Sequence, residues 1–231
     1  MAVESPADIF VIGHNRLSIE AGLYARFLGY RVTILGGGLS RAGTLDDDSK
    51  FSLDTCTTKL GRKALESHDH ILDESLVTHS DSLFENYVVP LSNSDLLSES
   101  FKEDCESIDV GMGESELPEK IDEDVEYDTQ VFNLKVKLKS GESAVYTADV
   151  LMDFRDPIEQ ESLSVDTKFE GDASHAEKAR AELLIKPTQD FYLLRREDSA
   201  DEAGIPFGEG LNQIVGLFQI LSDRPQLNLY Q

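Results

Sequence analysis

The residues whose spacing best suggests chemistry lie near the N-terminus, where Gly13, Asn15 and Ser18 occupy the three positions of a Gly-x-Gly-x-x-Gly turn. Such a turn joins a strand to a helix and places backbone N–H groups against the pyrophosphate of a dinucleotide. Only the first glycine is retained. Ser18 is small enough to allow close packing of the helix on the strand. Asn15 either adopts a left-handed turn or caps the helix, and its side chain would occupy space that a pyrophosphate uses.

The elements that must position this turn are visible in the flanking sequence. Residues 8–13 form a short apolar run that ends in glycine, which predicts a buried parallel strand. Residues 19–28 carry apolar side chains at helical spacing, and residues 30–35 predict a second strand. In dinucleotide domains this second strand ends in an acid that binds ribose hydroxyls. Here it ends in Gly36, so the topology of a dinucleotide domain is predicted with altered binding determinants.

A family resemblance extends this interpretation. The segment 9–35 resembles the N-terminus of flavin-dependent oxidoreductases of the pyridine nucleotide-disulfide type, including flavin monooxygenase-like members. Residues 83–97 are similar to a segment that follows the second strand in one bacterial branch, and 190–194 and 210–218 to its closing strand and helix. The resemblance implies an α/β, Rossmann-like FAD/NAD(P)-binding domain, with a parallel sheet flanked by helices and a β-meander crossover. FAD is the one cofactor that it implies.

A meander is also predicted from the residues themselves. Apolar and polar side chains alternate through residues 130–139, which predicts an amphipathic strand, and 144–146 and 149–154 are expected to follow as a second and a third. An earlier strand is predicted at 107–112. In the family the strand after the meander ends in a small-residue turn, commonly Ala-x-Gly, close to the cofactor. Here the residues 154–157 are Phe-Arg-Asp-Pro, so bulk and charge replace small residues.

The whole chain, 1–231, is expected to form one domain. Residues 114–128 hold eight acids and one lysine and are interpreted as a solvated acidic connection, with a site for a cation or a basic partner as the alternative. Residues 157–188 stand where related proteins insert a nicotinamide domain, and this insert is too short for one. That domain is therefore expected to be absent. Helices are predicted at 60–65, 80–87, 94–102, 174–185 and from 208 or 210 onward, and a closing strand at 191–194.

Composition excludes several classes of partner. The 231 residues include 45 Asp and Glu against 21 Lys and Arg, a formal net charge of −24, which disfavours nucleic acid and anionic membranes. The sequence shows no signal peptide and no apolar run long enough for a membrane span. Cys56 and Cys105 form no Cys-x-x-Cys pair, which fits a reducing compartment. We expect a soluble, cytoplasmic protein, and no oligomeric state follows from the sequence.

The candidate cofactor-binding residues surround three predicted turns. They are Gly13, Asn15, Arg16 and Ser18 in the first turn, Gly36 and Gly37 after the second strand, and Arg195 after the closing strand. The last of these, with its neighbour Arg196, either holds a phosphate or acidic ligand or pairs with the acids of this chain.

The sequence gives only weak signals for other chemistry, and no catalytic or metal-binding residue is assigned. The residues 68–70, His-Asp-His, with Asp73 and Glu74 contain ligand types for a metal, but such short clusters are common by chance. His14 is a candidate base or ligand contact in the turn. Cys56 has no histidine partner that its spacing identifies.

Three functional hypotheses follow. The first is a degenerate, noncatalytic relative of flavin oxidoreductases with weak or absent dinucleotide binding, acting in ligand sensing or partner binding. The second is a working FAD-dependent oxidoreductase that another chain reduces, since a flavin itself carries the redox chemistry. The third is an acidic module that binds a basic protein.

Overall fold

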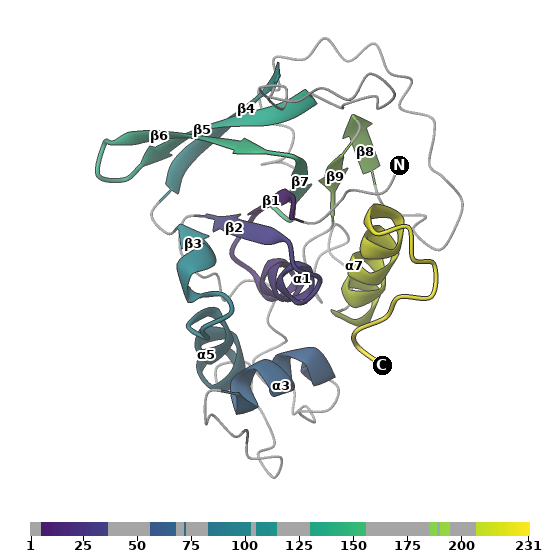
Figure 1. Cartoon of the computed structure of the whole chain (residues 1–231). Coiled ribbons are helices and arrows are strands. Elements are labelled where there is room, and N and C mark those ends of the chain that lie inside the picture. Colours follow the sequence, from purple (N-terminus) through teal and green to yellow (C-terminus); the bar gives the residue numbers. More distant parts are fainter. Residues whose placement is uncertain are drawn as a thin grey trace.

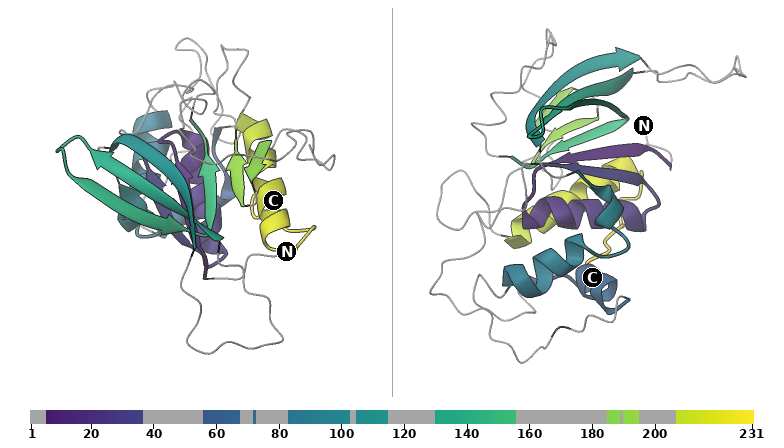
Figure 2. Two further views of the ribbon diagram at one scale, coloured as in Figure 1. Left: turned by 90° about the horizontal axis from the view of Figure 1, so that it is seen from above. Right: turned by 90° about the vertical axis from the view of Figure 1, so that its left-hand side faces the viewer.

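The computed structural model has three layers, with a central sheet between a layer of helices and a smaller second sheet (Figure 1). The right-hand view of Figure 2 shows the smaller sheet, the central sheet and the helices in that order. The structure describes residues 6–36, 56–67, 72, 83–102, 105–114, 130–155, 185–188, 190–194 and 207–231.

Five parallel strands form the central sheet in the order β3-β2-β1-β7-β9, and β8 pairs antiparallel with β9 at one edge. The apolar run of β1 is buried because both of its faces are covered. The predicted α/β fold with a parallel sheet is thereby confirmed. The strands are β1 (Asp8–Ile12), β2 (Arg31–Leu35), β3 (Phe101–Lys102), β7 (Val150–Asp153), β8 (Ile185–Thr188) and β9 (Phe191–Leu193).

The chain runs from β1 to β2 on one side and returns on the other side of β1 as β7. Ligands of open α/β sheets bind beyond the carboxyl ends of the strands at such a switch point. Alternate residues of β1 serve the two cores: Ile9 and Val11 belong to the core on the helical side, and Phe10 and Ile12 to the core shared with the second sheet.

Helices α1 (Arg16–Phe27) and α7 (Phe207–Leu221) cover one face of the central sheet. They contact closely because Gly210 has no side chain: a Cβ there would collide with the side chain of Leu17. Further along the same two helices, the rings of Tyr24 in α1 and Phe218 in α7 stack with their centroids 4.8 Å apart. The predicted closing strand and terminal helix, with its apolar face, are confirmed as β9 and α7.

The second sheet is an antiparallel meander of β4 (Cys105–Glu114), β5 (Gln130–Leu138) and β6 (Ser143–Ala148). The meander is confirmed, but its membership differs from the prediction. The strand predicted at 149–154 is β7, which lies in the central sheet, and the strand predicted at 107–112 supplies the third meander strand. The physical reason is burial: every residue of β7 is buried, as in a parallel central strand, whereas β6 alternates.

Of two short helices that the sequence predicts, the structure confirms one and not the other. The helix expected at 60–65 is confirmed as α3 (Lys59–Glu66). The helix expected at 94–102 is wrong: a 3₁₀ turn (Ser98–Ser100) leads directly into β3. Serine hydroxyls explain the difference, since Ser94 Oγ donates to the carbonyl of Leu91 at 2.7 Å and serines compete with helical hydrogen bonds.

Two further helix predictions fall partly outside the described residues. Of the helix expected at 80–87, the structure describes a π-helix (Phe84–Val88) that continues into α5 (Val89–Ser92). Residues 174–184 lie outside the described part, and Ile185, the expected end of that helix, instead begins β8. Most of the insert 157–188 and the acidic connection also lie outside it. None of the helices that the structure describes is long and apolar enough to cross a membrane.

Candidate functional site

The turn after β1 requires the glycine that the sequence retains. Gly13 has a φ of +125°, in the region that side-chain-bearing residues rarely adopt. Its N–H donates to the carbonyl of Leu35 at 2.8 Å, which joins the turn to the end of β2. A Cβ on Gly13 would lie 3.3 Å from the Cβ of Phe154, so the turn after β7 also closes against it.

Asn15 caps helix α1. Its backbone is extended (φ −117°, ψ 173°), so the capping role is confirmed and the left-handed alternative is wrong. Its side chain accepts a hydrogen bond from the N–H of Ser18 at 3.0 Å, and the hydroxyl of Ser18 in return accepts one from the N–H of Asn15 at 3.0 Å. The two residues form a reciprocal capping box. Ser18 is fully buried, so this small residue lies in the packed interior and also makes the hydrogen bonds of the capping box.

The amide of Asn15 also reaches across the sheet. Its Nδ2 donates to the carbonyl oxygen of Phe154 at 2.9 Å, in a buried contact between residues 139 positions apart. The N–H of Phe154 donates to the carbonyl of Ile12 at 2.8 Å. Both backbone polar groups of Phe154 are thus bonded to the first strand and its turn.

An ion pair follows β7 directly. Asp153 is fully buried at the end of the strand, and its carboxylate accepts from Nε and Nη2 of Arg155, the latter at 2.9 Å, and from the backbone N–H of Arg155 at 2.9 Å. The pairing accounts for a buried carboxylate at this edge of the sheet. The sequence showed the charge at Arg155, but the role of Asp153 was missed, because nothing in the sequence distinguishes it from the chain's many other acids.

Arg16 and His14 fill the space beside the turn. The guanidinium of Arg16 is buried, lies 3.6 Å from the ring centroid of Phe207 and donates to the carbonyl of Cys56 at 2.8 Å. The buried His14 ring packs over Gly36, where a Cβ would lie only 2.6 Å from an imidazole carbon. Neither an acid nor any other side chain fits at position 36 without moving that ring.

The structure therefore brings five of the seven candidate residues together: Gly13, Asn15, Arg16, Ser18 and Gly36 meet at the carboxyl ends of β1 and β2. Gly37 and Arg195 lie outside the described residues, as do the His-Asp-His cluster at 68–70 and its neighbouring acids. Within the described residues no group of three His, Cys, Asp or Glu side chains could hold a metal ion. Cys56 is buried and not in a disulfide.

A second buried polar cluster lies on the outer side of α1. The carboxylate of Glu20 accepts hydrogen bonds from the hydroxyls of Tyr87 and Thr58, the latter at 3.0 Å. The hydroxyl of Tyr87 in turn accepts one from the N–H of Thr58 at 3.2 Å. Burial, reinforced by the charge of Glu20, raises the pKa of Tyr87 well above its usual value. Sequence reasoning missed this cluster; the one signal was an acid among the small and apolar residues of a predicted helix.

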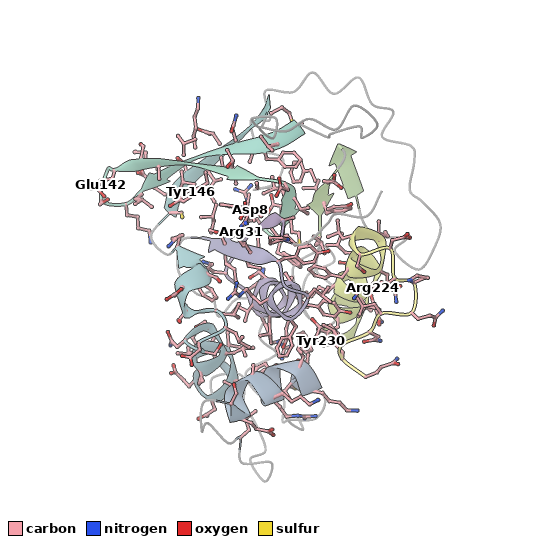
Figure 3. The ribbon with its side chains drawn as sticks, in the orientation of Figure 1. Asp8, Arg31, Glu142, Tyr146, Arg224 and Tyr230 are labelled. Atoms are coloured by element: carbon pink, nitrogen blue, oxygen red, sulfur yellow. The ribbon has the colours of Figure 1, made fainter. Side chains whose placement is uncertain are left out.

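The C-terminal segment completes this cluster. Tyr230 lies beside α1 (Figure 3), and its hydroxyl donates to the carbonyl of Glu20 at 3.4 Å. The backbone N–H of Leu229 donates to the hydroxyl of Tyr24 at 3.2 Å. Burial, together with nearby Glu20, raises the pKa of Tyr230 well above its usual value. The cluster joins four segments of the chain through hydrogen bonds, and we expect it to contribute to stability.

Three comparisons with known proteins were made. No protein-family model matches the chain, and the search of curated proteins found no match. Among solved structures, ornithine hydroxylase from Pseudomonas aeruginosa is similar with 17% identity and a TM-score of 0.40, over 64% of this chain and 38% of that one. THI4 from Thermovibrio ammonificans has 12% identity and a TM-score of 0.43, over 94% and 88%. OTEMO, solved with FAD and NADP, has 15% identity and a TM-score of 0.37, over 65% and 26%.

The aligned region spans less than two fifths of the ornithine hydroxylase chain and about a quarter of OTEMO. At these identities and TM-scores the likeness carries no ligand, substrate or reaction over to this chain. The names of these structures agree with the resemblance stated above, at low identity and, for two of the three, partial coverage.

Proposed function

We propose that this chain is a noncatalytic domain of the FAD-binding type, with weak or absent dinucleotide binding, that acts in ligand sensing or partner binding. The observation that carries the proposal is the state of the donors in the first turn. The N–H groups of Gly13, Asn15 and Ser18, the three fingerprint positions, all donate to atoms of the chain itself. Phosphate binding at a helix N-terminus depends on such N–H groups pointing at the ligand.

The other contacts of a dinucleotide are also replaced. At the end of β2, the His14 ring lies against Gly36, where an acid would hold the ribose. At the end of β7, the ion pair of Asp153 and Arg155 stands where the family has small residues against the cofactor. These replacements support the proposal of weak or absent dinucleotide binding.

The proposal is tested by the visible spectrum of the purified protein, followed by calorimetric titration with FAD, NAD and NADP. We expect no flavin absorbance and no saturable heat with any of the three. A flavin spectrum at near-stoichiometric occupancy would refute the proposal. Pull-down at low and high salt then separates partner binding from ligand sensing. A basic partner that binds the acidic side chains of this protein is lost at high salt, because salt screens the charges.

The alternative, a working FAD-dependent oxidoreductase reduced by another chain, is favoured by one observation. Gly13 keeps the positive φ of the fingerprint turn, and α1 begins at the switch point. Under this alternative Gly13→Ala abolishes FAD binding in a protein that remains folded. Under the proposed function the same substitution lowers stability only, and there is no flavin to lose.

A further inference from the structure

We propose that Asn15, Asp153, Phe154 and Arg155 form an internal clasp that holds the turn after β1 against the turn after β7, in the place that a dinucleotide takes in the related fold. This inference rests on the proposed function and deepens it. The replaced residues do more than obstruct a cofactor: they supply the cross-sheet contacts that keep the ligand-free domain closed.

The first half of the clasp is the bond between Asn15 and Phe154. A capping asparagine needs only its side-chain oxygen, which accepts from the N–H of Ser18. The same amide uses its Nδ2 to donate to the carbonyl of Phe154, in a second and separate interaction. Serine or aspartate would serve the cap equally well, but neither provides an amide donor for that carbonyl. The choice of asparagine is explained by the contact across the sheet.

The second half of the clasp is the ion pair. Asp153 lies in register with Ile12, the last residue of β1, so its buried carboxylate stands beside the first turn. Three donors of Arg155 satisfy it: the backbone N–H, Nε and Nη2. This geometry draws the arginine side chain back against its own strand. The backbone of Phe154, which lies between the two partners, is thereby fixed in the position that Asn15 bonds.

The clasp predicts coupling between residues that are 139 positions apart in sequence. If Asn15 only caps α1, its loss affects the first turn of that helix. If it also closes the clasp, its loss affects the amides of Phe154 and Arg155, whose N–H groups bond to Ile12 and Asp153. Amide-resolved hydrogen exchange of the ligand-free protein distinguishes these two outcomes.

The experiment compares wild type with Asn15→Ser, which keeps a capping oxygen and removes the amide donor. Asn93→Ser, at an exposed position after α5, is the matched control. We expect exchange at Phe154 and Arg155 to rise at least about tenfold in Asn15→Ser, with the amide of Ser18 still protected, and no change in the control. Asn15→Asp, which also caps and cannot donate, provides the same test should Asn15→Ser fold poorly.

The ion pair is tested in the same way. Arg155→Met removes the guanidinium beside the buried Asp153 carboxylate and should accelerate exchange at Phe154, whereas the double variant Asp153→Asn with Arg155→Met should recover part of the protection. The clasp is refuted when exchange at residues 154 and 155 is unchanged by these substitutions or changes only within α1. Failure of the proposed function would appear separately, as a flavin spectrum in wild type, so the two failures are distinguishable.

Discussion

Removal of one hydroxyl from the buried cluster beside α1 should cost a large share of the stability of this domain. In Tyr87→Phe the ring remains and two hydrogen bonds disappear: the one that Tyr87 donates to the carboxylate of Glu20 and the one it accepts from the N–H of Thr58. Because Tyr87 and Glu20 are both fully buried, water cannot replace either bond.

The magnitude follows from the two partners. A hydrogen bond to a charged group contributes about 1.5–3 kcal/mol and one between neutral groups about 0.5–1.5 kcal/mol. We therefore expect the free energy of unfolding to fall by about 2–4.5 kcal/mol. Domains of this kind have total stabilities of about 5–15 kcal/mol, so the substitution should be easily measured.

The assay is equilibrium unfolding in urea, followed by circular dichroism at neutral pH, with the slope used to confirm that the same surface is exposed. Tyr146→Phe is the matched control, because Tyr146 packs against Phe10 through its ring, at a centroid distance of 5.6 Å, and phenylalanine keeps that ring. The control should change stability by less than about 0.5 kcal/mol. Equal effects from both substitutions would contradict the reasoning.

Three further outcomes are expected. The pKa values of Tyr87 and Tyr230 are raised, so both hydroxyls stay neutral in the folded state. Their contribution to stability is complete below about pH 10 and is lost as the pH rises through the raised pKa values. In an alkaline titration, the tyrosinate absorbance of these two residues should therefore appear only when circular dichroism reports unfolding. Gly13→Ala places a Cβ at positive φ and 3.3 Å from the Cβ of Phe154, which should lower stability by about 1–3 kcal/mol; an unchanged urea midpoint would show that the turn can relax. Gln213→Met should raise the melting temperature, since neither amide atom of buried Gln213 has a hydrogen-bond partner among the described residues and an unsatisfied buried amide costs about 1–3 kcal/mol; a lowered melting temperature would indicate that the amide is satisfied.

Much of the fold could be predicted because its strands are short apolar runs bounded by glycine or polar residues. The first βαβ unit, the meander and the closing strand with its helix were found in this way. The strand at 149–154 was found and assigned to the wrong sheet, because sequence adjacency to β6 favours a hairpin. In the structure it pairs in parallel with β1, and all four of its residues are buried.

The candidate site was predictable in position and less so in its contacts. The spacing of Gly13, Asn15 and Ser18 located the turn, and helix-capping preferences correctly suggested one of two roles for Asn15. The bond from Asn15 to Phe154 could not be predicted, because periodicity carries no information on which distant backbone carbonyl a side chain reaches. The same holds for His14, whose ring lies over Gly36 only because β1 and β2 are adjacent.

The position of β7 between β1 and β9 has a consequence for biosynthesis. β1 finds its partner β2 within the first 35 residues, but its other edge is paired only by β7, which begins at Val150. On the ribosome, the N-terminal unit therefore emerges with an open strand edge that persists until the chain beyond the meander has been made. Contacts of such sequence separation slow folding, and open edges invite pairing with other chains. A nascent or truncated chain that lacks β7 is therefore expected to aggregate more readily than a chain in which both edges of β1 are paired.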